Sequence, residues 1–120
     1  MKKLFRIIVL HGAPKDTHIS TEIYVVAEDE ETVYNWLDKE KTGWSEYIEE
    51  CKNEGEPAEE YDGDKTIPYK DWVIKSRGDL EDERGWEDAY YGVTKWAWEP
   101  IKATKKDMEI LLKLGIAIEI

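Results

Sequence analysis

The sequence predicts a single α+β domain over residues 1–120, with a mainly antiparallel sheet and helices packed on one face. A chain of 120 residues suffices for one hydrophobic core and is too short for two. Runs of β-branched and aromatic residues alternate with segments in which apolar residues recur every three or four positions. Apolar residues make up 41% of the chain, which predicts a folded protein even though 38% of the residues are charged.

The first quarter of the chain predicts a β-hairpin. Residues 4–10 and 22–27 are rich in Ile, Val, Leu and aromatic residues, as is typical of strands. The first strand is largely apolar on both faces, which indicates an interior position with a paired strand on each side. The connection between the two strands contains Gly12 and Pro14 and is too long for a two-residue turn.

Two helices are expected next. Asp29 can cap the first helix, because its side chain can accept hydrogen bonds from the N–H groups of the first turn. The apolar residues of this helix follow at helical spacing: Val33, Trp36 and Leu37. Gly43 ends it, and a second helix is expected over residues 45–53. The apolar stripe of the second helix comprises Trp44, Tyr47, Ile48 and Cys51. Cys51 is therefore expected to be a core residue and not a nucleophile.

The second half of the chain predicts two further strands, a helix and a terminal strand. Residues 54–66 are expected to form an acidic loop, and residues 69–76 a strand with Trp72 and Ile74 facing one way. Residues 93–101 form a second strand, with Trp96 and Trp98 on the same face. Thr104 and Asp107 are spaced as a capping box. The helix that follows buries Met108, Leu111 and Leu112, Gly115 closes it, and residues 116–120 alternate as a strand.

Composition restricts the partners. The net charge of −11 repels phosphate backbones, so sequence-independent binding to DNA or RNA is not expected. A basic partner, such as the nucleic-acid channel of an enzyme, would suit this charge, although acidity can also serve solubility alone. The one cysteine, Cys51, cannot form an internal disulfide, which favours a reducing compartment. No apolar segment approaches the length of a membrane span, so we expect a cytoplasmic protein.

The sequence contains no catalytic signature that we can identify. It has no phosphate-binding loop, nucleophile elbow or dinucleotide fingerprint. His11 and His18 lack a known metal-ligand spacing, and a calcium loop starting at Asp62 would have Val73 where it needs Glu. We therefore expect no enzyme activity, metal or cofactor. The alternative is a metal-dependent nuclease site built on four carboxylates: Asp71, Asp79, Glu81 and Asp82.

Aromatic residues are concentrated late in the chain. Five of the fourteen lie between Trp86 and Trp98. One interpretation is structural, with Trp96 and Trp98 packing the sheet onto helices. The other is a pocket in which aromatic rings stack on a planar base and nearby cations bind phosphate. The predicted ligand-binding residues are Arg77, Arg84, Trp86, Tyr90, Tyr91, Lys95, Trp96 and Trp98.

The opening hairpin with residues 25–31, and the run from Asp88 to Trp96, resemble small acidic proteins encoded in phage accessory regions. This resemblance implies a phage protein that acts in the cytoplasm of the bacterial host cell and blocks bacterial immunity. Such proteins sequester a nucleotide signal or bind and block a defence protein of the host. Those that sequester a nucleotide are commonly oligomers.

Two functional hypotheses follow, from different classes. The first is a non-catalytic protein that sequesters a nucleotide-like signal, such as a cyclic nucleotide or cyclic ADP-ribose, in the aromatic and arginine pocket, and a homo-oligomer is the assembly that this hypothesis expects. The second is an acidic inhibitor that imitates DNA, or otherwise binds a host nuclease, through its carboxylates at 54–64 and 79–88. A phage structural adaptor with an ordinary core remains a third interpretation.

Overall fold

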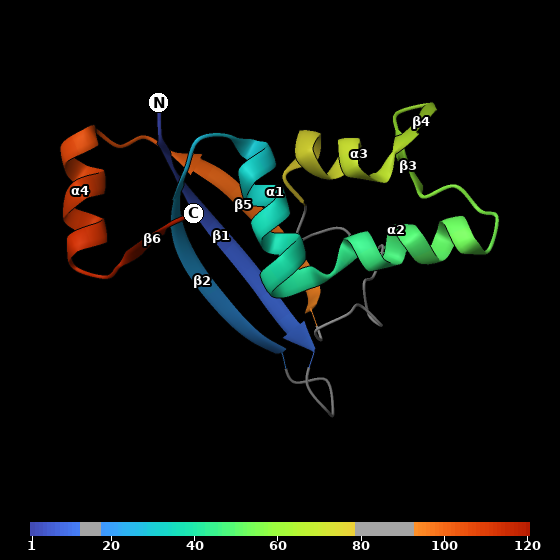
Figure 1. Cartoon of the computed structure of the whole chain (residues 1–120), viewed down its shortest axis with the longest axis horizontal. Coiled ribbons are helices and arrows are strands. Elements are labelled where there is room, and N and C mark those ends of the chain that lie inside the picture. Colours follow the sequence, from blue (N-terminus) through green and yellow to red (C-terminus); the bar gives the residue numbers. More distant parts are fainter. Residues whose placement is uncertain (13–17, 79–92) are drawn as a thin grey trace.

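A four-stranded sheet forms the centre of the molecule (Figure 1). The computed structural model describes residues 1–12, 18–78 and 93–120. The strands lie in the order β5–β1–β2–β6. Their bounds are β1 Lys3–Gly12, β2 His18–Ala27, β5 Val93–Ile101 and β6 Ala117–Glu119. The α+β class and the mainly antiparallel sheet are confirmed.

Strand β1 lies inside the sheet, paired antiparallel with β2 on one side and with β5 on the other. This confirms the prediction from its two apolar faces. The odd-numbered side chains Phe5, Ile7 and Val9 are buried in the main core, and the even-numbered Arg6 and Ile8 point to the opposite face. The sheet therefore has one face covered by helices and one that is largely open.

The first two helices form as expected. Asp29 caps α1 (Glu30–Leu37), and its Oδ1 accepts hydrogen bonds from Thr32 N at 2.8 Å and Thr32 Oγ1 at 2.7 Å. These bonds hold the pKa of Asp29 below its usual range. A π-helical turn, η2 (Asp38–Thr42), joins α1 to α2 (Trp44–Asn53). Gly43 supplies the left-handed backbone, with φ 66°, that separates them.

The acidic loop expected over residues 54–66 is only partly a loop. Strand β3 (Glu59–Asp62) pairs antiparallel with β4 (Lys65–Pro68), so the prediction missed a hairpin. Its signal was the Gly63–Asp64 pair, the two residues between Asp62 and its partner Lys65, because Gly63 takes the positive φ of 67° that a two-residue turn requires. The acidic composition concealed this turn, since strands of this kind have no apolar face to bury.

The strand predicted over residues 69–76 is wrong, because this segment is the helix α3 (Tyr69–Ser76). The prediction relied on the alternation of Trp72 and Ile74. The buried residues are instead Tyr69 and Val73, which are four positions apart and share one helical face. A short apolar segment fits both the two-residue period of a strand and the 3.6-residue period of a helix, so only its packing decided between them.

Helix α4 (Lys105–Lys113) begins with the predicted capping box. Thr104 Oγ1 accepts from Asp107 N at 3.1 Å, and Asp107 Oδ2 accepts from Thr104 N at 2.9 Å. Met108 packs with Leu4, Val26 and Ala117 in a second cluster, on the face opposite α1. Strand β6 then pairs parallel with β2. Three helices thus serve the main core, and α4 covers one end of the other face.

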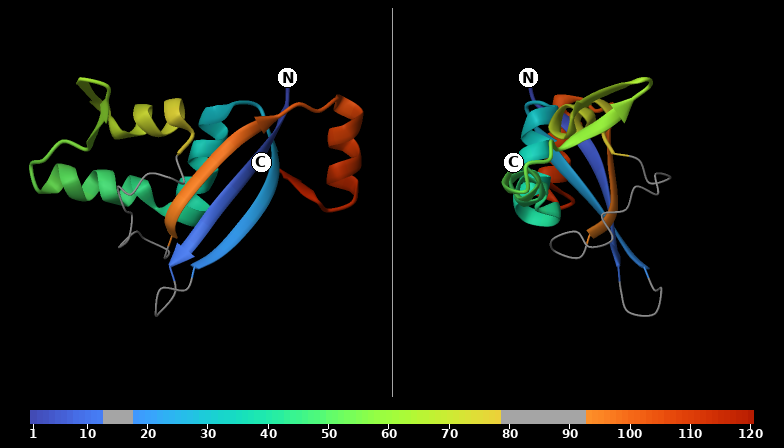
Figure 2. Two further views of the ribbon diagram at one scale, coloured as in Figure 1. Left: turned by 180° about the vertical axis from the view of Figure 1, so that it is seen from behind. Right: turned by 90° about the vertical axis from the view of Figure 1, so that its right-hand side faces the viewer.

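Helix α2, the β3–β4 hairpin and α3 extend away from the sheet (Figure 1). Helix α2 runs outward, the hairpin forms the tip and α3 returns toward the sheet. Helix α4 lies at the opposite end of the molecule, as the left view of Figure 2 also shows. One end of the molecule therefore consists of α2, the hairpin and α3, and the other end consists of α4.

The backbone after α3 lies directly on Trp96. Gly78 forms an isolated antiparallel bridge to Ala97, and Trp98 N donates to Arg77 O at 2.8 Å. A Cβ at Gly78 would lie 2.2 Å from Trp96 Cε3 and 2.4 Å from the Trp96 carbonyl oxygen. Gly78 also has a left-handed φ of 76°. Both the close approach and the backbone conformation require glycine here.

We therefore expect Gly78→Ala to lower the free energy of unfolding by at least about 2 kcal/mol, because steric overlap adds to backbone strain. Gly63→Ala is the matched control, since Gly63 has a φ of 67° and no heavy atom within 4 Å of the added Cβ. It should lose only about 1 kcal/mol, from backbone strain alone. Urea unfolding of both variants measures the difference, and equal losses would contradict the close approach.

Candidate functional site

Aromatic side chains from four elements, α1, α2, α3 and β5, form one connected group, which we call the aromatic cluster. Its members are Tyr34, Trp44, Tyr47, Tyr69, Trp72, Trp96 and Trp98. Trp96 is its centre: its ring centroid lies 4.9 Å from that of Trp44, 6.1 Å from Trp72 and 6.0 Å from Trp98. Edge-to-face and stacked pairs of this kind stabilise beyond the area that they bury.

Most of the aromatic cluster is core. Trp44, Trp96 and Trp98 are at most 4% exposed. The structural interpretation of Trp96 and Trp98, which pack the sheet onto the helices, is confirmed. A ligand could stack on either ring only after the segments above them moved. A ligand-binding role for these two residues stays a prediction.

The structure brings two predicted site residues together through a carboxylate that the sequence analysis missed. Glu30, in the first turn of α1, accepts a hydrogen bond from Trp98 Nε1 and one from Arg77 Nε at 2.9 Å. Arg77 caps α3 in a left-handed conformation, with φ 56°. Its guanidinium is thus already bound to an anion of the protein itself. No sequence signal links Glu30 to Trp98, because they are 68 residues apart.

The remaining predicted site residues cannot be placed in this arrangement. Arg84, Trp86, Tyr90 and Tyr91 lie outside the described residues. Lys95 pairs with Leu10 through the backbone of β5, and its side chain lies outside the described part. The side chains of the two histidines, His11 and His18, and the carboxylates Asp79, Glu81 and Asp82 of the alternative nuclease site also lie outside it. Asp71 is exposed on α3.

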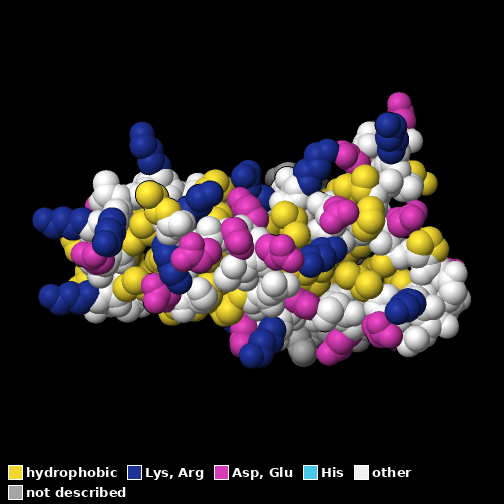
Figure 3. Space-filling view, turned by 45° about the horizontal axis from the view of Figure 1, so that its top comes forward, with side chains coloured by type: hydrophobic (Ala, Val, Ile, Leu, Met, Phe, Trp, Pro, Cys, Tyr) yellow, Lys and Arg dark blue, Asp and Glu magenta, His cyan; other side chains and the backbone are white. Residues whose placement is uncertain are grey.

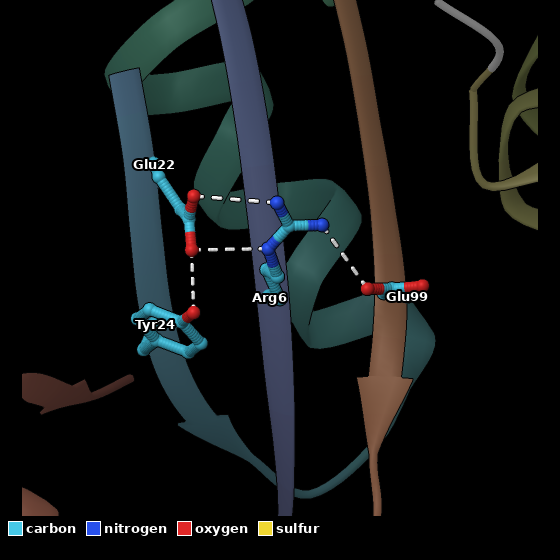
Figure 4. Close-up of polar contacts among 4 residues, drawn as sticks. All are labelled: Arg6, Glu22, Tyr24 and Glu99. Carbon is cyan, nitrogen blue, oxygen red and sulfur yellow. Dashed lines mark hydrogen bonds and ion pairs between the residues drawn. The ribbon is translucent and has the colours of Figure 1, made fainter.

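The open face of the sheet carries a network of charged side chains at its centre (Figure 4). Arg6 of β1 donates to both carboxylate oxygens of Glu22 on β2, from Nε at 3.0 Å and Nη2 at 3.3 Å. Its Nη1 donates to Glu99 on β5 at 3.2 Å, and Tyr24 donates its hydroxyl to Glu22. One arginine therefore joins three adjacent strands across this face.

The network shifts the pKa values of Glu22 and Tyr24. The Arg6 guanidinium, and then the Tyr24 hydroxyl, hold the pKa of Glu22 below its ordinary value. The same bond raises the pKa of Tyr24, because the hydroxyl must keep its proton to donate it. With Glu22 and Glu99 ionised, the network keeps one excess negative charge. It is better suited to holding the strands in register than to acid–base chemistry, since Glu22 is held ionised.

A groove of about 790 Å³ lies where β1 begins and β5 ends. Its apolar lining includes Leu4, Ile101 and Met108. Four lysines also line it: Lys2, Lys3, Lys102 and Lys105. Lys and Arg side chains project from this end of the molecule in Figure 3. An apolar lining beside ammonium groups can hold a molecule with an apolar part and an anionic group. None of the predicted site residues lines this groove.

The described part of the chain has neither a cluster of metal-binding side chains nor a membrane-spanning helix. No three His, Cys, Asp or Glu side chains in it are grouped so that they could hold a metal ion. None of its helices is long and apolar enough to cross a membrane.

Comparison with known proteins gives one informative relationship. No protein-family model matches the chain, and no solved structure matches it. The chain is similar to the SPbeta prophage-derived uncharacterized protein YoqY of Bacillus subtilis (strain 168), with 32% identity over 127 aligned positions that cover 97% of each protein. The chain belongs to the YoqY family. Because this relative is prophage-derived, the relationship confirms the resemblance to phage-encoded proteins with respect to origin.

In this member of the YoqY family, we expect Glu30→Ala to lower the free energy of unfolding by about 1–3 kcal/mol, because the buried Trp98 N–H loses its acceptor. Glu31→Ala is the matched control: Glu31 also lies in the first turn of α1, and it pairs with the exposed Lys70 at 2.9 Å. It should lose about 0–1 kcal/mol. Urea unfolding and the Trp98 Nε1–H resonance measure the effect, and an unmoved resonance in Glu30→Ala would disprove the bond.

The pKa of Glu22 makes the stability of the fold depend on pH. A lowered pKa of Glu22 stabilises the fold above the ordinary glutamate pKa, and this contribution disappears as the pH falls through the folded-state value. Arg6→Gln should return the Glu22 pKa toward its ordinary value, and Tyr24→Phe should raise it less, since Arg6 has the larger effect. NMR titration of the Glu22 carboxyl in the three proteins gives the order. A larger rise in Tyr24→Phe would contradict the network in Figure 4.

Proposed function

We propose that this chain is a phage-encoded, non-catalytic binding protein that inhibits a host protein by occupying a basic surface. The part that would bind is residues 44–64, which we call the acidic arm: helix α2, the following loop and the start of the β3–β4 hairpin. The proposal rests on one observation. The acidic arm carries nine carboxylates and one lysine, and it projects from the sheet (Figure 1).

The charge of the chain is unevenly distributed between its two ends. Residues 101–120, at the opposite end, contain four lysines and three carboxylates. Several carboxylates of the acidic arm are exposed to solvent, among them Glu49, Glu54, Glu56 and Glu59. A concentrated field of one sign raises association rates with a surface of opposite sign and repels other acidic molecules. This distribution suits a basic protein surface such as the one a nuclease offers to DNA.

The acidic arm is braced by α3. Tyr69 N donates to Ala58 O at 2.8 Å, and the Tyr69 ring lies 5.8 Å from that of Tyr47. Lys75 of α3 forms an ion pair with Asp62 of the hairpin. These contacts limit the conformations that the carboxylates can adopt. Preorganisation of this kind reduces the conformational entropy lost on binding.

Sequestration of a nucleotide-like signal is the second candidate. Arg77 and the Trp98 indole both bind Glu30, so two of the predicted ligand-binding residues are neighbours. The other predicted residues of this site, Arg84, Trp86, Tyr90, Tyr91 and the side chain of Lys95, lie outside the described part of the chain. Sequestration is the weaker proposal, because the guanidinium of Arg77 and the indole N–H of Trp98 already bind Glu30, and Trp96 is buried. A thermal-shift screen with cyclic di- and trinucleotides and cyclic ADP-ribose isomers distinguishes the two proposals.

To test the acidic arm, the tagged chain is incubated with Bacillus subtilis extract, and the retained proteins are identified. The arm variant combines Glu49→Gln, Glu54→Gln, Glu56→Gln and Glu59→Gln. The matched control removes four carboxylates elsewhere: Glu28→Gln, Glu40→Gln, Glu109→Gln and Glu119→Gln. We expect the wild type and the control to retain one basic protein. The affinity of that protein for the arm variant should be at least tenfold lower than for the wild type.

Salt dependence gives the second readout. Binding through the acidic arm should weaken steeply as the salt concentration rises, because exposed charges are screened. Equal retention by the arm variant and the control, or retention insensitive to salt, would rule out the acidic arm as the binding surface. A ligand response in the thermal-shift screen, with no protein retained, would favour the nucleotide proposal instead.

A further inference from the structure

The β6 edge of the sheet has backbone groups directed outward. Ile120 N donates to Val26 O at 3.0 Å, and β6 pairs parallel with β2 in the register Tyr24↔Ala117 and Val26↔Glu119. In a parallel ladder, N–H and C=O groups of alternate residues point to the same neighbour. Ile118 and Ile120 therefore direct theirs to β2, and Ala117 and Glu119 direct theirs away. No strand of the described part of the chain pairs with this edge.

Large aliphatic side chains are exposed beside this edge. Ile116 is 53% exposed and Ile118 is 44% exposed. Earlier in the chain, Ile110 of α4 is 46% exposed and Leu114, which caps the end of α4, is 65% exposed. Ile118 and Ile120 are two positions apart and so lie on one side of this edge, and Ile116 immediately precedes β6. Edge strands with apolar residues are templates for pairing with another chain. Proteins usually protect such edges with charged residues or proline. Here the charges next to the edge are Glu119 and its ion-pair partner, the partly exposed Lys2.

The charge distribution favours a second copy of this chain as the occupant. Two molecules of net charge −11 repel each other, and the repulsion is smallest where the local charge is balanced. Residues 101–120 are such a region, with four lysines and three carboxylates. Contact there also leaves the two acidic arms at the far ends of the assembly, because each arm lies at the opposite end from α4 (Figure 1).

We infer that the chain forms a two-fold symmetric dimer by antiparallel pairing of β6 with β6 of a second copy, centred on Ile118. In this register Ala117 lies opposite Glu119 of the partner subunit, and each such pair exchanges two backbone hydrogen bonds. The two Ile118 side chains meet at the symmetry axis, and Ile116 lies opposite Ile120 of the partner subunit. The contact is isologous, so it closes as a dimer and does not propagate.

Sedimentation velocity tests the dimer. The wild-type chain should sediment with twice the monomer mass of 14.1 kDa in the high micromolar range. Glu119→Pro removes an outward N–H, which an edge strand tolerates when the N–H does not pair within its own sheet. It should weaken dimerisation at least tenfold, and the matched Glu119→Gln, which keeps the N–H, should not. Ile118→Glu should also give monomers, because it brings two carboxylates together at the axis.

Tyr61→Glu is the control for adding a charge at an exposed apolar residue, since Tyr61 is 69% exposed on the hairpin. This variant should leave the dimer intact. Amide hydrogen exchange on the wild type provides a readout that needs no variant. The Ala117 and Glu119 amides should be protected, and more so as concentration rises. A monomer at all concentrations, a dimer that survives both Glu119→Pro and Ile118→Glu, or fast exchange at both amides would each overturn the inference.

Discussion

The packing around Trp96 is the constraint on which the rest of the structure depends. Its ring contacts Trp44 at the start of α2, Trp72 of α3 and Trp98 of its own strand, and the Gly78 backbone lies against it. Helices that are distant in the sequence are thereby fixed on one face of the sheet. Because α2 and α3 are also the elements that hold the hairpin, the position of the acidic arm follows from the same contacts. A change in this packing would move the arm relative to the sheet.

The two faces of the sheet differ in the interactions that hold them. Beneath the helices, β1 and β2 contribute apolar residues to a buried core. On the open face, Arg6 joins Glu22 and Glu99 across three strands, and these side chains remain partly exposed. Exposed ion pairs contribute little stability each, so this network specifies strand register more than it adds free energy. The main core carries the stability, and on the open face one arginine is shared between two carboxylates.

The acidic arm, the lysine-lined groove and the β6 edge are separate surfaces with different charge and polarity. Membership of the YoqY family relates the chain to a prophage-derived protein of Bacillus subtilis. The predicted nucleotide pocket retains Arg77 and Trp98 as neighbours, but each is engaged with Glu30.

The sequence by itself determined the elements whose signals are local. The first hairpin strands, the Asp29 cap, the Thr104 capping box and the strand carrying Trp96 and Trp98 all depend on residues a few positions apart. Only the tertiary structure decided whether residues 69–76 form a helix or a strand, because a short apolar segment satisfies both periods. Likewise, the bridge from Glu30 to Trp98, the parallel pairing of β6 and the exposure of Ile118 depend on contacts between distant segments. No local pattern encodes which of several matching partners a strand or a carboxylate will meet.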